Sequence, residues 1–373
     1  MFPTLFKDDQ KNGCASHLLH SSITEGFKKN PAIQDLISNK ICRVASKFNK
    51  SYAFKYALND EQVNQGIKER PLIQDVPTWW GSTRESCSRF LDHKDDVDEN
   101  NKYKNMKVVN NALQRAKQKK DELSQLVFTS ADMKKVDSLN KFLTSFDIYS
   151  TTLGGNKYVT GSIVLPVMKS IQADLVVSDK DPSYIATLKQ SILDDIQPRI
   201  SKNLNYQLLV RATALDPRFK NLKVLSSKVE RQEIFKSIED EMRHLTETDL
   251  AKENEKEMED SAAKKRKLGL EFYESDSEEE SDFDEVKTEI QLYKKEPMLD
   301  KECDPLEWWK KRSERYPLLS KMVRKYLCVP ATSVESERTF SSLGLLLTKR
   351  RLCMTGENVN KQLFLKDKLN KQI

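Results

Sequence analysis

The sequence lacks the features of a membrane-spanning, secreted or loop-dominated protein. Its 373 residues include only 10 glycines, which argues against an all-β chain and favours a helical one. No apolar run approaches the roughly 18 residues that a membrane span requires. The opening residues, MFPTLFKDDQKNG, do not place a charged segment before an apolar one, as a secretion signal would. We therefore expect a soluble, intracellular chain with no membrane partner.

Cysteine is also sparse. The six cysteines, at positions 14, 42, 87, 303, 328 and 353, form no Cys-x-x-Cys pair, a pattern typical of reduced thiols in the cytosol or nucleus. Ligand-like spacing occurs at Cys14, His17 and His20 in CASHLLH. A zinc site needs further ligands, and His93 and His244 stand alone, so packing is favoured over metal binding. We predict no metal site and no cofactor.

Charge, by contrast, is abundant and segregated. Charged residues make up 32% of the chain, and the net charge is +6. Residues 271–285, EFYESDSEEESDFDE, contain nine acidic and no basic side chains, so the remainder carries a net charge of +15. A basic body is consistent with nucleic acid as a partner, and equally with a lysine-rich solvated surface.

Residues 248–297 are predicted to be a disordered charged linker, because the basic cluster 264–267 is followed at once by the acidic run. The basic cluster resembles a nuclear import signal. Ser275, Ser277 and Ser281 each have an acidic residue three positions on, the spacing that an acidophilic kinase prefers. Phosphorylation of these serines is a hypothesis.

Elsewhere apolar residues recur at helical spacing. One stripe comprises Leu36, Ile37, Ile41, Val44 and Phe48, which predicts a helix with one buried face. Pro71 breaks the pattern, and the following residues 75–83 are predicted to be extended before a turn or helix start.

A second helical region is predicted from Lys104 to Leu143. Within it, Thr129-Ser-Ala-Asp-Met is predicted to cap a further helix. The core positions expected on that helix are Val136, Leu139, Leu143 and Phe146. The later segment Ala212–Lys220 has a proline directly after an acid and predicts a turn with a cap.

Four sequence features together carry a family resemblance. They are Cys14-x-x-His17, the segment DVPTWWGST from Asp75, the segment ALDPRFK from Ala214, and the block from Asp304 to Leu369. In this order they resemble elements of the hAT superfamily of DNA transposases and its domesticated descendants, including BED-zinc-finger transposase-like nuclear proteins. The last block, with its WWK, YPLL, VPATS and SERTFS segments, resembles the family's C-terminal dimerisation region and is the most specific of the four.

The resemblance implies a mainly α chain. It would be the remnant of a ribonuclease-H-like fold, interrupted by a large all-α insertion and with its sheet largely missing. The expected parts are a partial ribonuclease-H-like remnant (1–75), the helical insertion (76–247), the disordered charged linker (248–297) and the dimerisation region (298–373).

The resemblance also implies that Glu337 matches the third catalytic acid of an active transposase. Three carboxylates must converge to hold two Mg²⁺ ions in such enzymes. The family's two upstream aspartates have no counterpart here, because Asp8 and Asp9 lie too close to Cys14. We therefore expect no intact catalytic site, no enzyme activity and no Mg²⁺, which intact relatives bind. The alternative is a fragment or incomplete gene model of a full-length hAT transposase or of a BED-finger regulator that binds DNA.

Two functions remain open from the sequence. The first is dimerisation, as a homodimer or with related hAT proteins, because the segment from Pro317 to Leu327 carries an apolar face wider than a lone surface helix needs. The residues expected at the interface are Trp308, Trp309, Tyr316, Leu318, Leu319, Met322, Val323, Tyr326, Phe340, Leu363 and Phe364. The alternative is that these residues only pack the parent fold, and both uses can hold together.

The second function is that of a nuclear regulator with nonspecific affinity for DNA. Trp80 matches the tryptophan that stacks on a flipped base in active relatives. Lys349, Arg350 and Arg351 are candidate phosphate contacts, or alternatively the cationic end of a helix.

Overall fold

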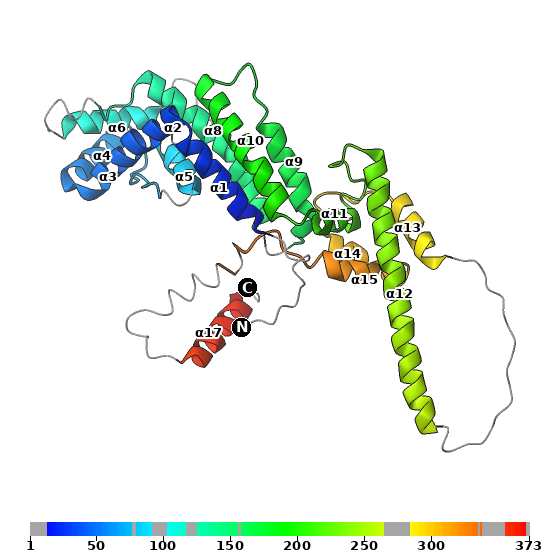
Figure 1. The fold of residues 1–373 in the computed structure, drawn as a ribbon. Helices are drawn as coiled ribbons and strands as arrows, with labels where there is room; N and C mark the ends of the chain where they lie inside the picture. The colour runs from blue at the N-terminus through cyan, green and yellow to red at the C-terminus, as the bar shows by residue number, and fades with distance from the viewer. Residues whose placement is uncertain are drawn as a thin grey trace. The chain divides into compact units, whose positions relative to one another are not determined.

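Helices are the regular secondary structure of the residues that the structure describes. The computed structural model describes residues 13–76, 80–91, 103–116, 125–155, 158–264, 284–334, 336–337 and 355–370, and these residues contain no strand (Figure 1). The mainly α prediction is confirmed, whereas the ribonuclease-H-like remnant stays a prediction. Within the same ranges, no helix combines the length and the apolar character needed to cross a membrane.

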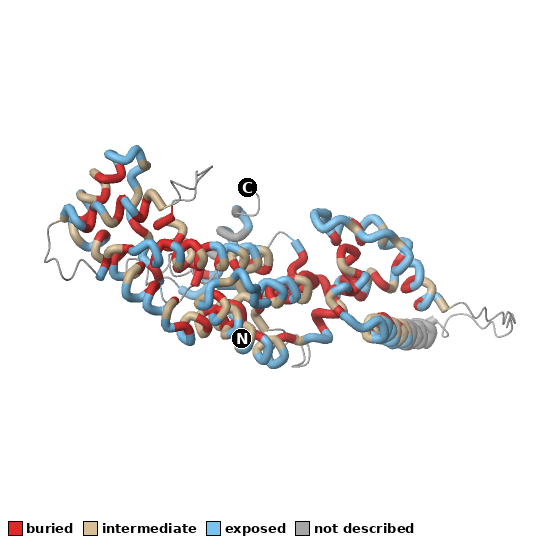
Figure 2. The backbone as a smooth tube through the Cα atoms, turned by 90° about the horizontal axis from the view of Figure 1, so that it is seen from above, coloured by how far each residue is buried: buried red, intermediate tan, exposed pale blue. Residues whose placement is uncertain are grey.

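Internal contacts divide the chain into two compact units that are interleaved in sequence. The first, here called the α1–α10 unit, comprises residues 13–155, 167–204 and 332–373. The second, the α11–α15 unit, comprises the described residues of 156–166 and 205–331. Buried residues alternate with exposed and half-buried ones along the helices of both units (Figure 2).

The α1–α10 unit is organised around two paired helices, α1 (Ala15–Lys28) and α10 (Ser183–Asn203). They run antiparallel, because the Gly13 N–H donates to the Asn203 carbonyl at one end and Asn30 donates to the Tyr184 carbonyl at the other. The helices approach closely at Gly26, where an added Cβ would lie 2.5 Å from Cγ1 of Ile192. A side chain at this position would therefore force the pair apart.

The predicted stripe from Leu36 to Phe48 is confirmed. It spans a π-helical segment η2 (Leu36–Cys42) and α3 (Arg43–Lys50), which follow the short α2 (Pro31–Asp35), and all five of its residues are buried. After α4 (Tyr52–Asn64) the chain is non-helical to residue 76, so the helix ends before the predicted break at Pro71. The segment 75–83 is extended only in part, because α5 (Trp80–Leu91) already includes residues 80–83.

The predicted cap at Thr129 is also confirmed. The Thr129 hydroxyl accepts the Asp132 N–H at 3.2 Å and the Asp132 carboxylate accepts the Thr129 N–H at 2.9 Å, which begins α8 (Ser130–Leu153) with a capping box. All four expected core residues of this helix are buried. Earlier in the chain, α6 (Lys104–Arg115) packs on α4. There the Glu61 carboxylate accepts hydrogen bonds from the side chains of Asn111 and Arg115.

The α11–α15 unit contains α11 (Tyr206–Leu215), the long α12 (Lys228–Lys264), α13 (Glu285–Lys295), α14 (Pro305–Lys310) and α15 (Pro317–Tyr326). The short 3-10 turn η4 (Gly161–Ile163) packs against α11. From η4 the chain enters α9 (Val164–Asp174). One apolar core joins α11, α12, α13, α14 and α15.

The structure differs from the predicted linker at both of its ends. Residues 248–264 continue α12, and residues 285–295 form α13. Val286, Ile290 and Tyr293 recur at helical spacing on α13 and are buried, which explains why this charged segment folds. Residues 265–283, including Ser275, Ser277 and Ser281, lie outside the described residues.

Candidate functional site

The segment ALDPRFK forms a buried polar joint directly after α11. The Asp216 carboxylate is fully buried and accepts Arg218 Nε at 2.9 Å and Nη2 at 2.6 Å. It also accepts the Ser162 hydroxyl at 2.6 Å and the Arg218 backbone N–H at 3.0 Å. A buried ion pair is tolerated when its remaining hydrogen-bonding capacity is filled in this way. The geometry confirms the predicted turn and gives its charged residues a structural role.

Lys220, two residues later, joins this turn to α13. Its amine donates to the carbonyl of Tyr293 at 2.6 Å and to that of Glu296, at the end of the helix. Burial lowers the pKa of Lys220, and the nearby Glu296 opposes that shift. A cation at a helix C-terminus meets the unsatisfied carbonyls and the negative end of the helix dipole. Lys220 therefore caps α13.

Aromatic side chains fasten α13 and α14 to the end of α11. Tyr293, Trp308, Trp309 and Tyr316 form one cluster, with ring centroids between 4.9 and 6.4 Å apart. Trp309 Nε1 donates to the Leu215 carbonyl at 2.9 Å, and the Tyr293 hydroxyl donates to the Ala214 carbonyl at 3.0 Å. Three residues predicted at a dimer interface, Trp308, Trp309 and Tyr316, are thus buried inside one unit.

The apolar face of α15 is covered within the same unit. Leu319, Met322, Val323 and Tyr326 are buried, Leu318 is half-buried, and the helix packs on α11, α12 and α13. At its start, Glu289 of α13 accepts the N–H groups of Leu318 at 3.1 Å and Leu319 at 2.9 Å. Three helices of this chain thus cover the apolar face that was predicted to contact a partner chain.

The C-terminal helix α17 (Gly356–Asn370) has the opposite character. Phe364, Leu365 and Leu369 are 61%, 57% and 60% exposed, whereas Val359 is buried. Within the described residues, no other helix packs extensively against α17. The two remaining predicted interface residues are Phe340 and Leu363. Phe340 and the side chain of Leu363 lie outside the described residues.

Trp80 begins α5 and is only slightly exposed, so its indole ring is part of the core. The motif around it is held by Asp75, whose buried carboxylate accepts the hydroxyls of Ser82 at 2.5 Å and Thr83 at 2.9 Å. Asp75 thereby fixes the chain where it enters the helix. Lys349, Arg350 and Arg351, the other predicted nucleic-acid contacts, lie outside the described residues.

Cys14, His17 and Glu337 meet in the α1–α10 unit. Their potential ligand atoms all lie within 4.8 Å of one another, and His17 Nε2 is 3.6 Å from Glu337 Oε1. The Ser333 hydroxyl donates to Glu337 Oε1 at 2.6 Å. The sequence signalled Cys14 and His17 as a pair and Glu337 separately, but no local pattern indicated that they converge.

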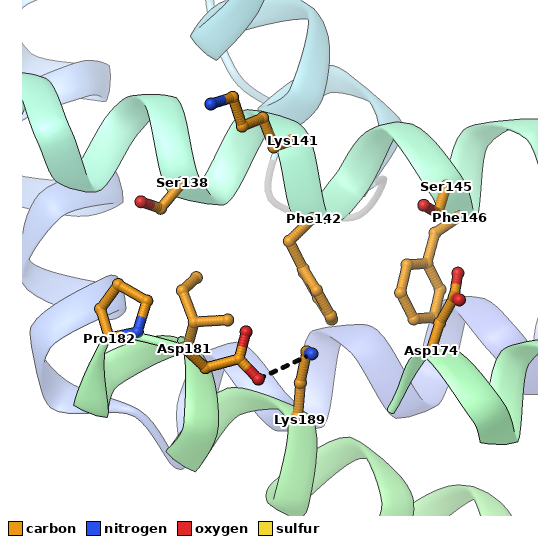
Figure 3. A pocket seen from close by; sticks show the side chains of 10 residues that line it. Ser138, Lys141, Phe142, Ser145, Phe146, Asp174, Asp181, Pro182 and Lys189 are labelled. Atoms are coloured by element: carbon orange, nitrogen blue, oxygen red, sulfur yellow. Dashed lines mark hydrogen bonds and ion pairs between the residues drawn. The ribbon is translucent and has the colours of Figure 1, made fainter. Parts of the chain in front are cut away.

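A cavity of about 350 Å³ lies between α8 and α10 in the α1–α10 unit (Figure 3). Phe142 and Phe146 line one side, and Asp181 pairs with Lys189 at 2.8 Å on the other. Asp181 also accepts the Ser178 N–H at 2.8 Å. The ion pair is thus satisfied within the protein, and the cavity offers no site with a defined ligand chemistry.

A smaller hollow at the start of α12 is strongly basic. Its lining comprises Lys220, Asn221, Lys228, Arg231, Gln232, Phe235 and Lys294. Four of these seven side chains are cationic and none is acidic. Lys294 Nζ lies 4.8 Å from the centroid of the Phe235 ring. This cation–π contact stabilises the ammonium group and leaves its charge in place.

Comparison with known proteins identifies the C-terminal part of the chain. Residues 289–369 match the hAT family C-terminal dimerisation region. This range contains α14, α15, α17 and most of α13. The match confirms that this part of the chain resembles the family's dimerisation region, and it begins at residue 289 rather than at the predicted 298.

One relative extends the resemblance to nearly the whole chain. It is 25% identical to human "Zinc finger BED domain-containing protein 4" over 368 residues, which cover 95% of this chain and 29% of that protein. It is 33% identical over 89 residues to the maize "Putative AC transposase" and "Putative AC9 transposase", each covering 23% of this chain and 11% of the relative. The chain thus spans less than a third of the length of these relatives. The predicted resemblance to hAT transposase-derived, BED-zinc-finger-type proteins is confirmed.

Proposed function

We propose that this hAT-derived chain acts as an assembly module, pairing through α17 with a second copy of itself or with a related hAT protein. The observation that carries the proposal is the exposure of Phe364, Leu365 and Leu369 within the matched dimerisation region. Three large apolar side chains on one short helix are the expected mark of a partner surface.

The other aromatic residues of the region support this assignment by exclusion. Trp308, Trp309 and Tyr316 already pack in the core of the α11–α15 unit. Within it, Trp309 Nε1 donates to the Leu215 carbonyl and the Tyr316 hydroxyl donates to Glu296. Exposing them to a second copy would break those contacts. α17 can pair without such a cost, because Phe364, Leu365 and Leu369 lie at the surface.

The energy available from α17 is appreciable. Full burial of a Leu or Phe side chain stabilises by about 1.5–3 kcal/mol. Covering the exposed three-fifths of three such residues on two copies would contribute roughly 5–11 kcal/mol, against an association cost of roughly 4–15 kcal/mol. The helix pair can thus supply the centre of an interface, and further residues of the region supply the remainder.

Sedimentation velocity on the full chain tests the proposal. The wild type is expected to sediment as a dimer, and Phe364→Asp/Leu365→Asp as a monomer, because two carboxylates in the apolar face would have to be desolvated. Tyr56→Asp, at a position of α4 that is 66% exposed, is the matched control and should leave the dimer intact. A dimer that survives the double α17 substitution would contradict the proposal.

We also propose that the chain has no transposase activity of its own. Among the described residues, Glu337 is grouped with a cysteine and a histidine rather than with the carboxylates that two Mg²⁺ ions require. A DNA strand-transfer assay with Mg²⁺ or Mn²⁺ should show no product. Product formation that is lost in Glu337→Ala would overturn this part of the proposal.

A second candidate function is nonspecific association with DNA in the nucleus, which the basic hollow at α12 favours. Lys228, Arg231 and Lys294 present cations to a phosphate, with no lining carboxylate to repel it. Binding to duplex DNA should therefore weaken steeply as salt rises.

The hollow's role in DNA binding is tested by Lys228→Gln/Lys294→Gln. The slope of log K against log salt should fall by about 2 units, one for each phosphate contact removed. Lys134→Gln/Lys202→Gln removes the same charge from exposed positions elsewhere and should leave the slope unchanged. Equal effects of the two pairs would exclude a specific role for the hollow. Microscopy of a fluorescent fusion tests the nuclear location.

A further inference from the structure

We propose that Cys14, His17 and Glu337 bind a divalent transition metal of the zinc type. These residues supply one sulfur, one imidazole nitrogen and one carboxylate oxygen, from segments that lie 319 residues apart at the Cys14–Ser333 contact. Zinc in proteins takes these three ligand types, and a site with three protein ligands keeps a fourth position for water.

The spacing suits a tetrahedral ion. With metal–ligand bonds of 2.0–2.3 Å, ligand atoms around tetrahedral zinc lie about 3.3–3.8 Å apart. The His17 Nε2 to Glu337 Oε1 distance, 3.6 Å, already falls in this range. The full set, within 4.8 Å, needs a closure of about 1 Å to meet that geometry. Side-chain rotation on half-exposed residues can supply this movement.

The Cys14 side chain is turned toward the segment that carries Glu337. It is the N-cap residue of α1, with extended backbone angles (φ −78°, ψ 111°), and its side chain does not cap its own helix. The sulfur instead accepts the Ser333 N–H at 3.3 Å. The sulfur therefore lies beside the segment around Ser333 and Glu337, where the third ligand is found.

The other two ligands are oriented by neighbouring structure. His17 lies one helical turn after Cys14, so both side chains lie on the same face of α1. Glu337 is held by the Ser333 hydroxyl, at 2.6 Å from Oε1. A hydrogen bond of this kind fixes a ligating carboxylate and raises metal affinity. Ser333 thus supports two of the three ligands, through its N–H and through its hydroxyl.

The ligand set selects the class of metal. Mg²⁺ and Ca²⁺ prefer oxygen ligands alone, whereas a thiolate and an imidazole favour Zn²⁺ and similar ions. The bound ion would join α1 to the segment around Glu337, fixing within one unit two parts of the chain that are distant in sequence. This inference does not depend on dimerisation.

Cobalt titration tests the site. The full chain is stripped of metal with a chelator and titrated with Co²⁺, whose spectrum reports both tetrahedral geometry and sulfur ligation. We expect one ion per chain, with a thiolate charge-transfer band that Zn²⁺ displaces. Cys14→Ser should abolish that band. His17→Ala and Glu337→Gln should each raise the Kd more than about tenfold, because removing even a residue that only hydrogen-bonds to a metal ligand lowers metal affinity by about that factor.

Matched controls separate the site from adventitious binding. Cys303→Ser and Cys328→Ser remove exposed thiols outside the cluster and should change neither the band nor the Kd. Glu337→Gln affects a half-exposed side chain, and circular dichroism will show whether each variant keeps its helical content. The proposal is wrong if the folded wild type binds neither Co²⁺ nor Zn²⁺ stoichiometrically. It is equally wrong if binding persists unchanged in folded Cys14→Ser and His17→Ala variants.

Discussion

Trp309→Ala distinguishes a core role of the dimerisation region's aromatic residues from an interface role. Trp309 is 3% exposed, and its ring contacts Tyr293 and Trp308. If it belongs to the core of the α11–α15 unit, its truncation destabilises the monomer. If it is an interface anchor, truncation weakens the dimer and leaves the monomer's stability unchanged.

The expected loss follows from the contacts of the ring. Truncating a buried Trp to Ala typically costs about 3–5 kcal/mol in unfolding free energy. The Leu215 carbonyl also loses its donor, Trp309 Nε1, and a buried acceptor without a partner costs about 1–3 kcal/mol. The total, about 4–8 kcal/mol, is a large part of the 5–15 kcal/mol, roughly, that stabilises a typical domain. The α11–α15 unit should therefore unfold at a much lower urea concentration in this variant.

Urea unfolding followed by circular dichroism measures this loss, and limited proteolysis locates it. Trp309→Phe keeps most of the ring but removes the hydrogen bond, so we expect a smaller loss of about 1–3 kcal/mol. Phe364→Ala, at an exposed aromatic of the same region, should change the unfolding free energy by less than about 0.5 kcal/mol. An unchanged urea midpoint for Trp309→Ala, together with loss of the dimer, would refute the core assignment.

Two further predictions concern the joints of the α11–α15 unit. Lys220→Met keeps the aliphatic volume but leaves the Tyr293 and Glu296 carbonyls without their donor. The unfolding free energy, measured in urea, should therefore fall by about 2–3 kcal/mol. Lys223→Met, at an exposed position nearby, is the control in the same assay. Burial raises the pKa of Glu289 above 4.5, although the N–H groups of Leu319 and Leu318 oppose the shift. The folded state then binds more protons than the unfolded state, so this group's contribution to stability falls as the pH rises above about 4.5. Glu289→Gln should remove that fall, and its stability relative to wild type should improve between about pH 4 and pH 7; an equal difference at both pH values would contradict the assignment.

Local features of the fold were predictable because their causes are local. The capping box at Thr129 requires only a hydroxyl and a carboxylate three residues apart, and the stripe from Leu36 to Phe48 is visible as spacing alone. The α13 helix was missed for a related reason. Its three buried residues are embedded in a strongly charged segment, and the composition of residues 248–297 as a whole concealed their spacing.

The candidate sites were predictable only in part, because they depend on long-range contacts. The segment with Asp216 and Lys220 predicted a turn. The sequence does not show that Lys220 contacts the end of α13, where Tyr293 lies 73 residues later. The apolar width of α15 indicated a partner, and only the packing shows that this partner is the same chain. The convergence of Cys14 with Glu337 is a tertiary contact that no periodicity encodes.

Site-specific photocrosslinking at α17 tests the proposed assembly most directly. The full chain would carry the substitution Leu365→p-benzoylphenylalanine, and irradiation would be followed by peptide mapping of the covalent product. The account predicts a covalent dimer in which this position is joined to residues 355–370 of a second copy, while the same photoreactive residue in place of Tyr56 gives no dimer. Crosslinks confined to the chain's own residues, or a dimer product equally strong from position 56, would contradict it.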